Sequence, residues 1–346
     1  MKTARGCLES RIPLVQHSRL PTFERLRDGG HEVLTLELAT HQDIRELHIG
    51  FLNMMPDAAL QATERQFIRL VGGCKRIAQF YVYPFSLDGL PRSDEALAYI
   101  ERYYSRFPAL QEAGLDALII TGANVANPGL EQEPFWNPLM EVVDWARKNV
   151  ASTLCSCLAT HAVLEFRYGQ RRVPRPRKTW GVFPHTLVDR DHPLVHDVNT
   201  RFEAPHSRHN DIPRDRFEAA GCMVLAESDI GVHIAVSPDG FRVIYFQGHP
   251  EYDTISLLKE YKREVGLYAD GARADYPPFP VDYFGVQERA LLNEHRSRVD
   301  AARLRGDAIP AFPERLVAQR LDNTWHDTAE AVVGNWMGLI YQVTHN

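Results

Sequence analysis

The chain has 346 residues, of which 44% are hydrophobic and 24% are charged, as in folded globular proteins and unlike disordered ones. With 39 Lys and Arg residues against 45 Asp and Glu residues, the formal charge is −6, which argues against a dedicated nucleic-acid-binding protein. The apolar runs, such as 117–120, fall far short of the roughly 18 residues that a membrane helix needs. We therefore expect neither nucleic acid nor a membrane among the partners of this protein.

The cysteines and the N-terminus point to a reducing compartment. The chain has five Cys residues. An odd number of Cys residues in a long chain is typical of a protein with free thiols rather than of a disulfide scaffold. The first ten residues are partly basic but are followed by no apolar core, so they do not form a secretory signal. We expect a cytoplasmic protein in which a thiol is free for chemistry.

From residue 46 onward, predicted strands and helices alternate. The predicted strands span 46–54, 76–83, 116–121 and 152–156, and the predicted helices span 58–71, a segment capped by Ser93, 135–148 and 157–168. Strands that alternate with helices of this length indicate βαβ units. We therefore predict an α/β fold, in which a parallel sheet is covered by helices on both faces as a three-layer sandwich.

The second half is predicted to be less regular. Residues 171–177 have the composition of a basic loop broken by proline, and 232–236 and 242–246 alternate as a hairpin around the turn 237–240. Asp253 is expected to cap a helix that runs to Val265.

The last 80 residues start with a proline-rich loop and continue with two mostly polar helical stretches. We therefore divide the chain into an N-terminal arm (1–45), a catalytic α/β domain (46–270) and a C-terminal extension packed on the core (271–346).

Cys157 is the first candidate catalytic residue. It follows an apolar strand directly and opens a helix, where the partial positive charge of the helix N-terminus stabilises a thiolate. Such a turn also presents the side chain at the carboxyl end of the sheet, where open α/β folds bind their ligands. An arbitrary Cys is more often a small buried core residue, and for Cys157 the two interpretations are about equally supported. Cys155 is expected to point into the core.

A thiolate nucleophile needs a base and a group that orients the base. His249 and Glu251 lie just past a predicted strand, on either side of Pro250. The imidazole of His249 could take and return protons, while Glu251 fixes its tautomer. A lone His at a strand end is more often structural, but a Cys–His–Glu triad assembled from distant segments explains all three residues.

Three further polar residues could contact a ligand. Ser207 lies in a polar stretch, Lys178 precedes an aromatic segment, and Arg263 lies two turns into the helix after His249. A solvated surface position is the alternative for Lys178 and Arg263. His206 and His209 are three residues apart, but no third ligand at helical or strand spacing accompanies them, so we expect no metal site.

Several uncommon motifs give the chain a family resemblance. In chain order they are Asn53-Met54-Met55-Pro56, Thr63-Glu64-Arg65-Gln66-Phe67, Ile119-Ile120-Thr121-Gly122-Ala123, Ser152-Thr153-Leu154 with Cys157, Gly181-Val182-Phe183, Ala204-Pro205-His206-Ser207-Arg208 and Gly248-His249-Pro250-Glu251-Tyr252-Asp253. This series resembles the homoserine O-acyltransferase (homoserine transsuccinylase) family over roughly residues 45–270, and again near 324–344.

The resemblance implies a class I glutamine amidotransferase-like fold and acyl transfer from an acyl-CoA to the hydroxyl of L-homoserine, a step toward methionine. It implies that Cys157 carries the acyl thioester, that His249 is the general base and that Glu251 is the partner of His249. Lys178, Ser207 and Arg263 match substrate-binding positions of the family. No cofactor beyond the acyl-CoA co-substrate is implied, and a homodimer is expected.

The acyl donor is indicated by Ala126. This residue aligns with a family position that is small in enzymes using succinyl-CoA and is Glu in those using acetyl-CoA; Ser207 belongs to the same specificity set. We therefore expect succinyl-CoA. The chain departs from the family at 57–59 and at 158–161, so acetyl-CoA as donor or serine as acceptor is an alternative. A glutamine amidotransferase-type hydrolase is a less favoured one.

Overall fold

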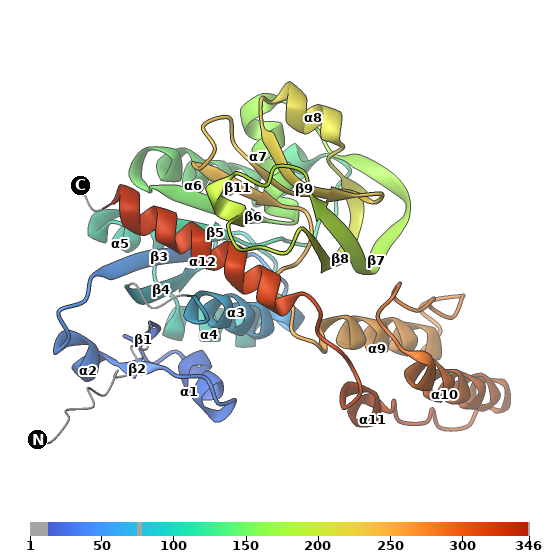
Figure 1. The fold of residues 1–346 in the computed structure, drawn as a ribbon. Helices are drawn as coiled ribbons and strands as arrows, with labels where there is room; N and C mark the ends of the chain where they lie inside the picture. Colours follow the sequence, from blue (N-terminus) through green and yellow to red (C-terminus); the bar gives the residue numbers. More distant parts are fainter. Residues whose placement is uncertain (1–12, 75–77, 345–346) are drawn as a thin grey trace, which may run out of the picture.

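A computed structural model describes residues 13–74 and 78–344 (Figure 1). Its main feature is a nine-stranded sheet with the strand order β4-β3-β5-β6-β11-β10-β9-β7-β8. The strands are β3 (Glu46–Leu52), β4 (Gln79–Phe85), β5 (Ala117–Ile120), β6 (Ser152–Ser156), β7 (Val173–Leu187), β8 (Arg201–Asp211), β9 (Met223–Ser228), β10 (Gly231–Val236) and β11 (Val243–Phe246).

The sheet has a parallel half and an antiparallel half. Strands β4, β3, β5, β6 and β11 pair in parallel, whereas β10, β9, β7 and β8 continue the sheet by antiparallel pairing. Because the carboxyl ends of parallel strands meet at one edge, the segments that follow β3, β5, β6 and β11 come together there. That edge contains the candidate site.

Helices cover both faces of the sheet. The helices before the C-terminal region are α1 (Pro21–Asp28), α2 (Leu36–Thr40), α3 (Asp57–Gly72), α4 (Asp94–Tyr103), α5 (Phe107–Ala113), α6 (Trp136–Asn149), α7 (Leu158–Tyr168) and α8 (Arg214–Ala219), with short 3-10 turns η1 (Leu130–Gln132) and η2 (Pro193–Val195). Phe51 of β3 packs in a core with α3, while the next residue, Leu52, packs in a second core with α6 and α7. Alternate side chains of a strand point to opposite faces, so the predicted three-layer α/β fold is confirmed.

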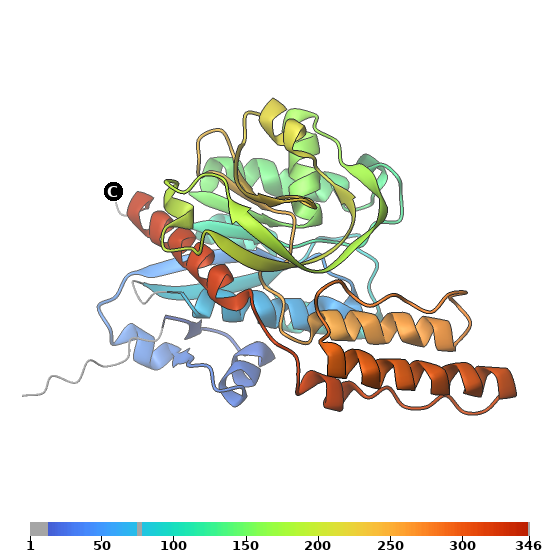
Figure 2. The same ribbon diagram turned by 45° about the vertical axis from the view of Figure 1, so that its right-hand side comes forward.

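The C-terminal helices form two different associations. They are α9 (Ser256–Ala269), α10 (Val286–Arg305), α11 (Glu314–Ala318) and α12 (His326–Val343). Helices α9, α10 and α11 share a separate apolar cluster that includes Tyr261 and Phe284, and they extend to one side of the sheet in Figure 2. Helix α12 returns to the main core, where the buried Trp336 donates a hydrogen bond from Nε1 to Oγ of Ser152 at 2.8 Å. The second predicted polar stretch is therefore a largely buried helix.

The N-terminal arm is more ordered than its sequence indicated. It contains α1, α2 and the small parallel sheet of β1 (Val15–Gln16) and β2 (Leu34–Thr35). Leu14, Leu20 and Phe23 are buried in the same core as α3, so the arm is packed along the domain. None of the helices within 13–74 and 78–344 combines the length and the apolar character that a membrane crossing requires.

Most predicted elements are confirmed, including the Ser93 cap, which accepts a hydrogen bond from the backbone N–H of Ala96, and the hairpin of β10 and β11. The prediction of a loop at 171–177 is wrong, because β7 begins at Val173. Its first residues pair with β8, while β9 reaches β7 only at Thr186 and Leu187. A strand with one open side tolerates proline, which lacks an N–H to donate.

The predicted cap at Asp253 is also wrong. Helix α9 begins at Ser256, after Ile255 and without a side-chain cap. The Asp253 carboxylate instead forms ion pairs with Arg65, at 2.8 Å, and with Arg69 of α3. Two guanidinium groups attract a carboxylate more strongly than a helix end does.

Candidate active site

Cys157 stands between the end of β6 and the start of α7. Its backbone has φ 52° and ψ −110°, a conformation that is rare for a residue with a side chain and that recurs at functional turns. The backbone N–H of Cys157 donates to the carbonyl of Phe246 at 2.8 Å, which ties the turn to the end of the neighbouring strand β11. The thiol is half-buried, so a substrate can reach it.

His249 and Glu251 lie beyond β11, the neighbour of β6 in the sheet. Nδ1 of His249 is 2.9 Å from Oε1 of Glu251, and both side chains are buried. Burial disfavours a charged imidazole, but the charges of Cys157 and Glu251 and their hydrogen bonds outweigh burial and raise the pKa of His249 well above its ordinary value. The structure thus brings together the three predicted catalytic residues as one interacting unit.

Lys178 and Ser207 both contact the carboxylate of Glu260, a residue that was not predicted from the sequence. Oε2 of Glu260 accepts a hydrogen bond from Ser207 Oγ at 2.7 Å and lies 3.1 Å from Nζ of Lys178. Oε1 of the same side chain accepts from the Tyr252 hydroxyl at 2.8 Å. Burial would raise the pKa of Glu260, but Lys178 and the two hydroxyl donors more than offset it and lower that pKa below its ordinary value.

Tyr252 links this cluster to the triad. Its ring stacks on the His249 imidazole with 4.3 Å between ring centroids, and its hydroxyl reaches Glu260. The stack and the hydrogen bond connect His249 to the Lys178–Glu260 pair. The sequence signal for Tyr252 was its place beside Glu251, but Glu260 is 82 residues from Lys178, and only the fold reveals their contact.

Arg263 and Ala126 are not joined to these clusters by direct contacts. The Arg263 side chain is 61% exposed on α9, and its guanidinium is 3.4 Å from Glu264. Ala126 is exposed in the loop after β5, and its backbone N–H donates to the buried Glu133 at 2.7 Å. The loop is therefore anchored, while the roles of both residues stay predictions.

Gly122, in the loop after β5, lies directly beside Cys157. A Cβ at this position would lie 3.6 Å from Cβ of Cys157 and 3.7 Å from the backbone nitrogen of Leu158. The bare glycine leaves space beside the thiol and beside the first N–H of α7. An acyl carbonyl on Cys157 could use that N–H as part of an oxyanion hole.

Arg208 and His161 are buried among other protein groups. Arg208 is buried and pairs with Asp211 at 2.9 Å. His161 is buried and its Nε2 is 3.1 Å from the Gln247 side chain, with burial lowering its pKa to about 3. His206 meets His185 and His233, which are distant in sequence, so its candidate partners lie outside the local spacing that the sequence argument considered.

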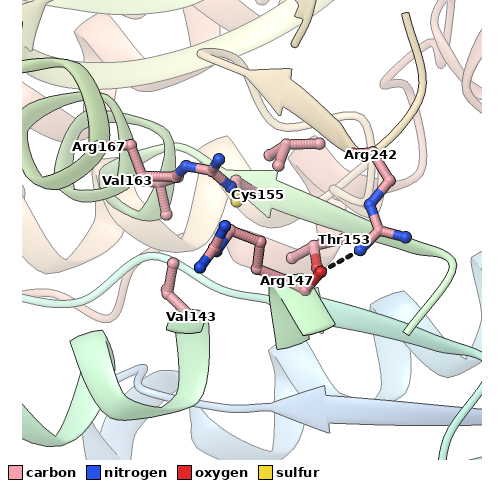
Figure 3. A pocket seen from close by; sticks show the side chains of 8 residues that line it. Val143, Arg147, Thr153, Cys155, Val163, Arg167 and Arg242 are labelled. Carbon is pink, nitrogen blue, oxygen red and sulfur yellow. Dashed lines mark hydrogen bonds between the residues drawn. The ribbon is translucent and has the colours of Figure 1, made fainter. Parts of the chain in front are cut away.

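The cavity in Figure 3 lies at the opposite end of the strands. It is lined by Thr153 and Val243, near the starts of β6 and β11, and by Cys155 and three arginines, Arg147, Arg167 and Arg242. Cys157 and His249 follow the other ends of the same strands, so this cavity is separate from the triad. Cys74, Cys155 and Cys222 are buried, as packing residues are expected to be. Cys7 lies outside the described residues.

The chain is similar to proteins of one known family. The family model described as homoserine O-succinyltransferase matches residues 13–346. The homoserine O-succinyltransferase of Allochromatium vinosum is 66% identical over 336 residues, which cover 97% of this chain and 94% of that protein. Those of Nitrosococcus oceani and Thioalkalivibrio nitratireducens are 60% and 61% identical with the same coverage. A glutamine amidotransferase structure from Thermotoga maritima has a TM-score of 0.47 and 11% identity, with coverage of 85% of this chain and 97% of that one.

Proposed function

Since this chain belongs to the homoserine O-succinyltransferase family, we propose that it transfers a succinyl group from succinyl-CoA to the hydroxyl of L-homoserine through a thioester on Cys157. The reaction serves methionine biosynthesis. The observation that carries the mechanism is the contact of His249 with both Cys157 and Glu251 at the carboxyl edge of the sheet. Together they are the nucleophile, the base and the orienting carboxylate of an acyl-transfer site.

The first half-reaction loads the enzyme. The Cys157 thiolate attacks the thioester carbon of succinyl-CoA, and the carbonyl oxygen becomes an oxyanion near the Leu158 N–H. The bond to the CoA sulfur then breaks, and the departing thiolate takes the proton of the His249 imidazolium. CoA leaves as a thiol, and succinyl stays on Cys157 as a thioester.

The second half-reaction unloads it. Glu251 holds Nδ1 of His249, which leaves Nε2 to take the proton of the homoserine hydroxyl. The hydroxyl oxygen attacks the thioester carbon, the bond to Sγ of Cys157 breaks, and O-succinylhomoserine leaves. The thiolate is restored beside a protonated His249, which is the pair that the first step requires.

The acceptor is recognised by the Lys178, Ser207 and Glu260 cluster together with Arg263. Homoserine carries an ammonium and a carboxylate, and a Lys–Glu pair can offer each of them its opposite charge. The cluster reaches the base through the stacked Tyr252 ring. At the donor side, Ala126 leaves room for the second carboxylate of succinyl, which a Glu would repel.

The test is thiol release from succinyl-CoA or acetyl-CoA with homoserine, serine or threonine as acceptor. We expect succinyl-CoA and homoserine to give the highest rate. Mass spectrometry without acceptor should find succinyl on Cys157, Cys157→Ala should abolish both signals, and Cys222→Ala, which removes a buried thiol, should keep them. Acceptor-dependent release that persists in Cys157→Ala would refute the mechanism. A preference for serine or acetyl-CoA would select the alternatives, and glutamine hydrolysis without transfer would select a hydrolase.

Two further proposals concern the setting of the enzyme. We propose a homodimer, which light scattering tests by giving twice the mass of one chain. We also place the enzyme in the cytoplasm, where a catalytic thiol stays reduced. Cell fractionation with an antibody to the chain tests that location.

A further inference from the structure

Three histidines from three strands meet in the antiparallel half of the sheet. His185 comes from β7, His206 from β8 and His233 from β10, and all three side chains are buried. Their ring centroids are 4.8 to 5.2 Å apart. The phenyl rings of Phe183, Phe202 and Phe246 pack around them. Imidazoles in such apolar surroundings need polar partners to offset their burial.

The nitrogen positions are close to those of metal ligands. Nε2 of His185 and Nε2 of His206 are 3.2 Å apart, and one nitrogen from each ring lies within 4.8 Å of the other two. Two imidazole nitrogens bound to one tetrahedral zinc ion, each about 2.0–2.1 Å from the metal, are about 3.3–3.4 Å apart. The first pair therefore already has the spacing of two ligands, and a nitrogen of His233 lies within 4.8 Å of both, from where the ring must move closer to complete the set.

The surroundings of His185 resemble those of a metal ligand. Nδ1 of His185 is 2.8 Å from the carbonyl of Phe183, so that nitrogen donates a proton and Nε2 presents a lone pair. Metal-binding histidines usually have their second nitrogen held by a carbonyl in this way. His185 is also buried, and burial favours the neutral ring that coordination requires.

Two nitrogens of the trio have no hydrogen-bond partner. They are Nδ1 of His206 and Nδ1 of His233, both completely enclosed by protein. An unpaired buried polar atom is unfavourable, because it has lost its hydrogen bonds to water and gained none in the protein. A metal ion that binds one of these nitrogens gives it a partner. Once an ion is bound, the protons can also be exchanged among the three rings, which removes part of the same cost.

The charges and the space around the trio also matter for a cation. Arg208 is held at 2.9 Å by Asp211, a carboxylate that also pairs with Arg175 at 3.1 Å. Gly248 provides the space, because a Cβ there would come within 2.8 Å of the rings of His206 and His233. The glycine before the catalytic His249 thus lets the trio pack directly behind the catalytic turn.

We propose that His185, His206 and His233 bind one divalent transition-metal ion, such as zinc, whose remaining position is taken by water. The ion joins β7, β8 and β10 behind the turn that carries His249. It also fixes β8 next to Ser207 and next to Pro205, whose carbonyl accepts the His249 N–H at 2.8 Å. Its role is to position the site, because the transfer chemistry already has its nucleophile and base.

The test uses the full chain, stripped with a chelator and dialysed first against Zn²⁺ or Co²⁺ and then against metal-free buffer. We expect one ion per chain by inductively coupled plasma mass spectrometry. The Co²⁺ form should show the strong visible bands of tetrahedral coordination. His233→Gln should weaken binding by about 100-fold or more, while His295→Gln, which removes a buried histidine of α10, should bind as the wild type does.

Two results would overturn the proposal. One is a wild-type chain that retains no ion, and the other is equal retention by wild type and His233→Gln. If His233→Gln does not fold, the Co²⁺ spectrum of the wild type decides alone, and absent or octahedral bands mean that the trio is a chain of hydrogen-bonded imidazoles. Metal content and spectrum do not depend on turnover, so they are independent of the proposed transferase reaction.

Discussion

Ser207 donates a hydrogen bond to Glu260 at 2.7 Å, and the oxygen that accepts it is also the one nearest Lys178. Two residues expected to bind substrate are thus already organised by a carboxylate of the protein. The proposed acceptor site is therefore an ion pair with a hydroxyl beside it, rather than a single cation. Such a pair suits a zwitterionic amino acid, since neither of its charges is left without a counter-charge.

Glu260→Gln tests this arrangement. The substitution keeps the size of the side chain but removes its charge, so Lys178 loses its partner and the homoserine ammonium loses an attraction. Hydrogen bonds to charged groups contribute about 1.5–3 kcal/mol, so the KM for homoserine should rise about 10- to 100-fold. Steady-state kinetics with each substrate varied measures this. The KM for succinyl-CoA should not change, and the exposed Glu141→Gln on α6 should leave both values alone. An unchanged KM for homoserine would contradict the prediction.

Glu251→Gln tests how the base is tuned. The carboxylate of Glu251 is one cause of the raised pKa of His249, and it is the cause that remains when Cys157 is acylated and uncharged. Deacylation needs neutral His249, so the rate of this step rises with pH through that pKa. With Gln the pKa is lower, and the acid limb of kcat should move to lower pH.

The same substitution should lower kcat by about 10²- to 10⁴-fold, because the imidazolium loses its counter-charge and its tautomer is no longer fixed. A pH profile of kcat at saturating substrates provides both readouts. If activity is lost but the acid limb of the kcat profile stays at the same pH, Glu251 only supports the fold of the turn.

The sequence predicted the triad because each of its members follows a recognisable strand end. It could not predict the role of Glu260, because the partners of that carboxylate come from β7, β8 and the turn before α9. These segments are far apart in the sequence, so no local pattern indicates that they are in contact. The cluster of His185, His206 and His233 was not predicted for the same reason, because none of the three histidines forms a recognisable motif within its own segment.

Two local predictions failed where tertiary contacts outweighed local preference. Proline in 171–177 favoured a loop, yet β8 supplies a partner for one side of that segment. Asp253 had the position of a helix cap, yet Arg65 and Arg69 of α3 compete for its carboxylate. Both failures depend on residues more than 30 positions away along the chain.

Ala126→Glu tests the choice of acyl donor. A carboxylate at this position would repel and crowd the distal carboxylate of succinyl, so kcat/KM for succinyl-CoA should fall about tenfold or more, as expected for like charges close together away from bulk water. Acetyl-CoA has no distal carboxylate, so kcat/KM for acetyl-CoA should fall only a little or should rise. The measurement is kcat/KM for both donors. Ala311→Glu adds the same charge in the exposed loop before α11 and should change neither value, and an equal loss with both donors would count against a donor-specific role.

Asp253→Asn tests the contact between α3 and the catalytic turn. Burial would raise the pKa of Asp253, but Arg69 and Arg65 outweigh it and lower that pKa below its ordinary value. Because the pKa is lower in the folded than in the unfolded chain, the stabilisation is complete above the unfolded value of about 3.9 and is lost as pH falls through the folded value.

At neutral pH the variant should lose about 2–4 kcal/mol of the free energy of unfolding, since it leaves two partly buried guanidinium groups unpaired. Its difference from wild type should shrink as pH falls below about 4, because Asp253 is protonated first in the unfolded chain and, at a lower pH, in the folded chain as well. Urea unfolding across this range measures the difference, with the exposed Asp144→Asn on α6 as control. Arg69 also donates to the Glu251 carbonyl at 3.3 Å, so kcat should fall together with stability. A difference that does not vary with pH would show that the aspartate acts by packing rather than by its charge.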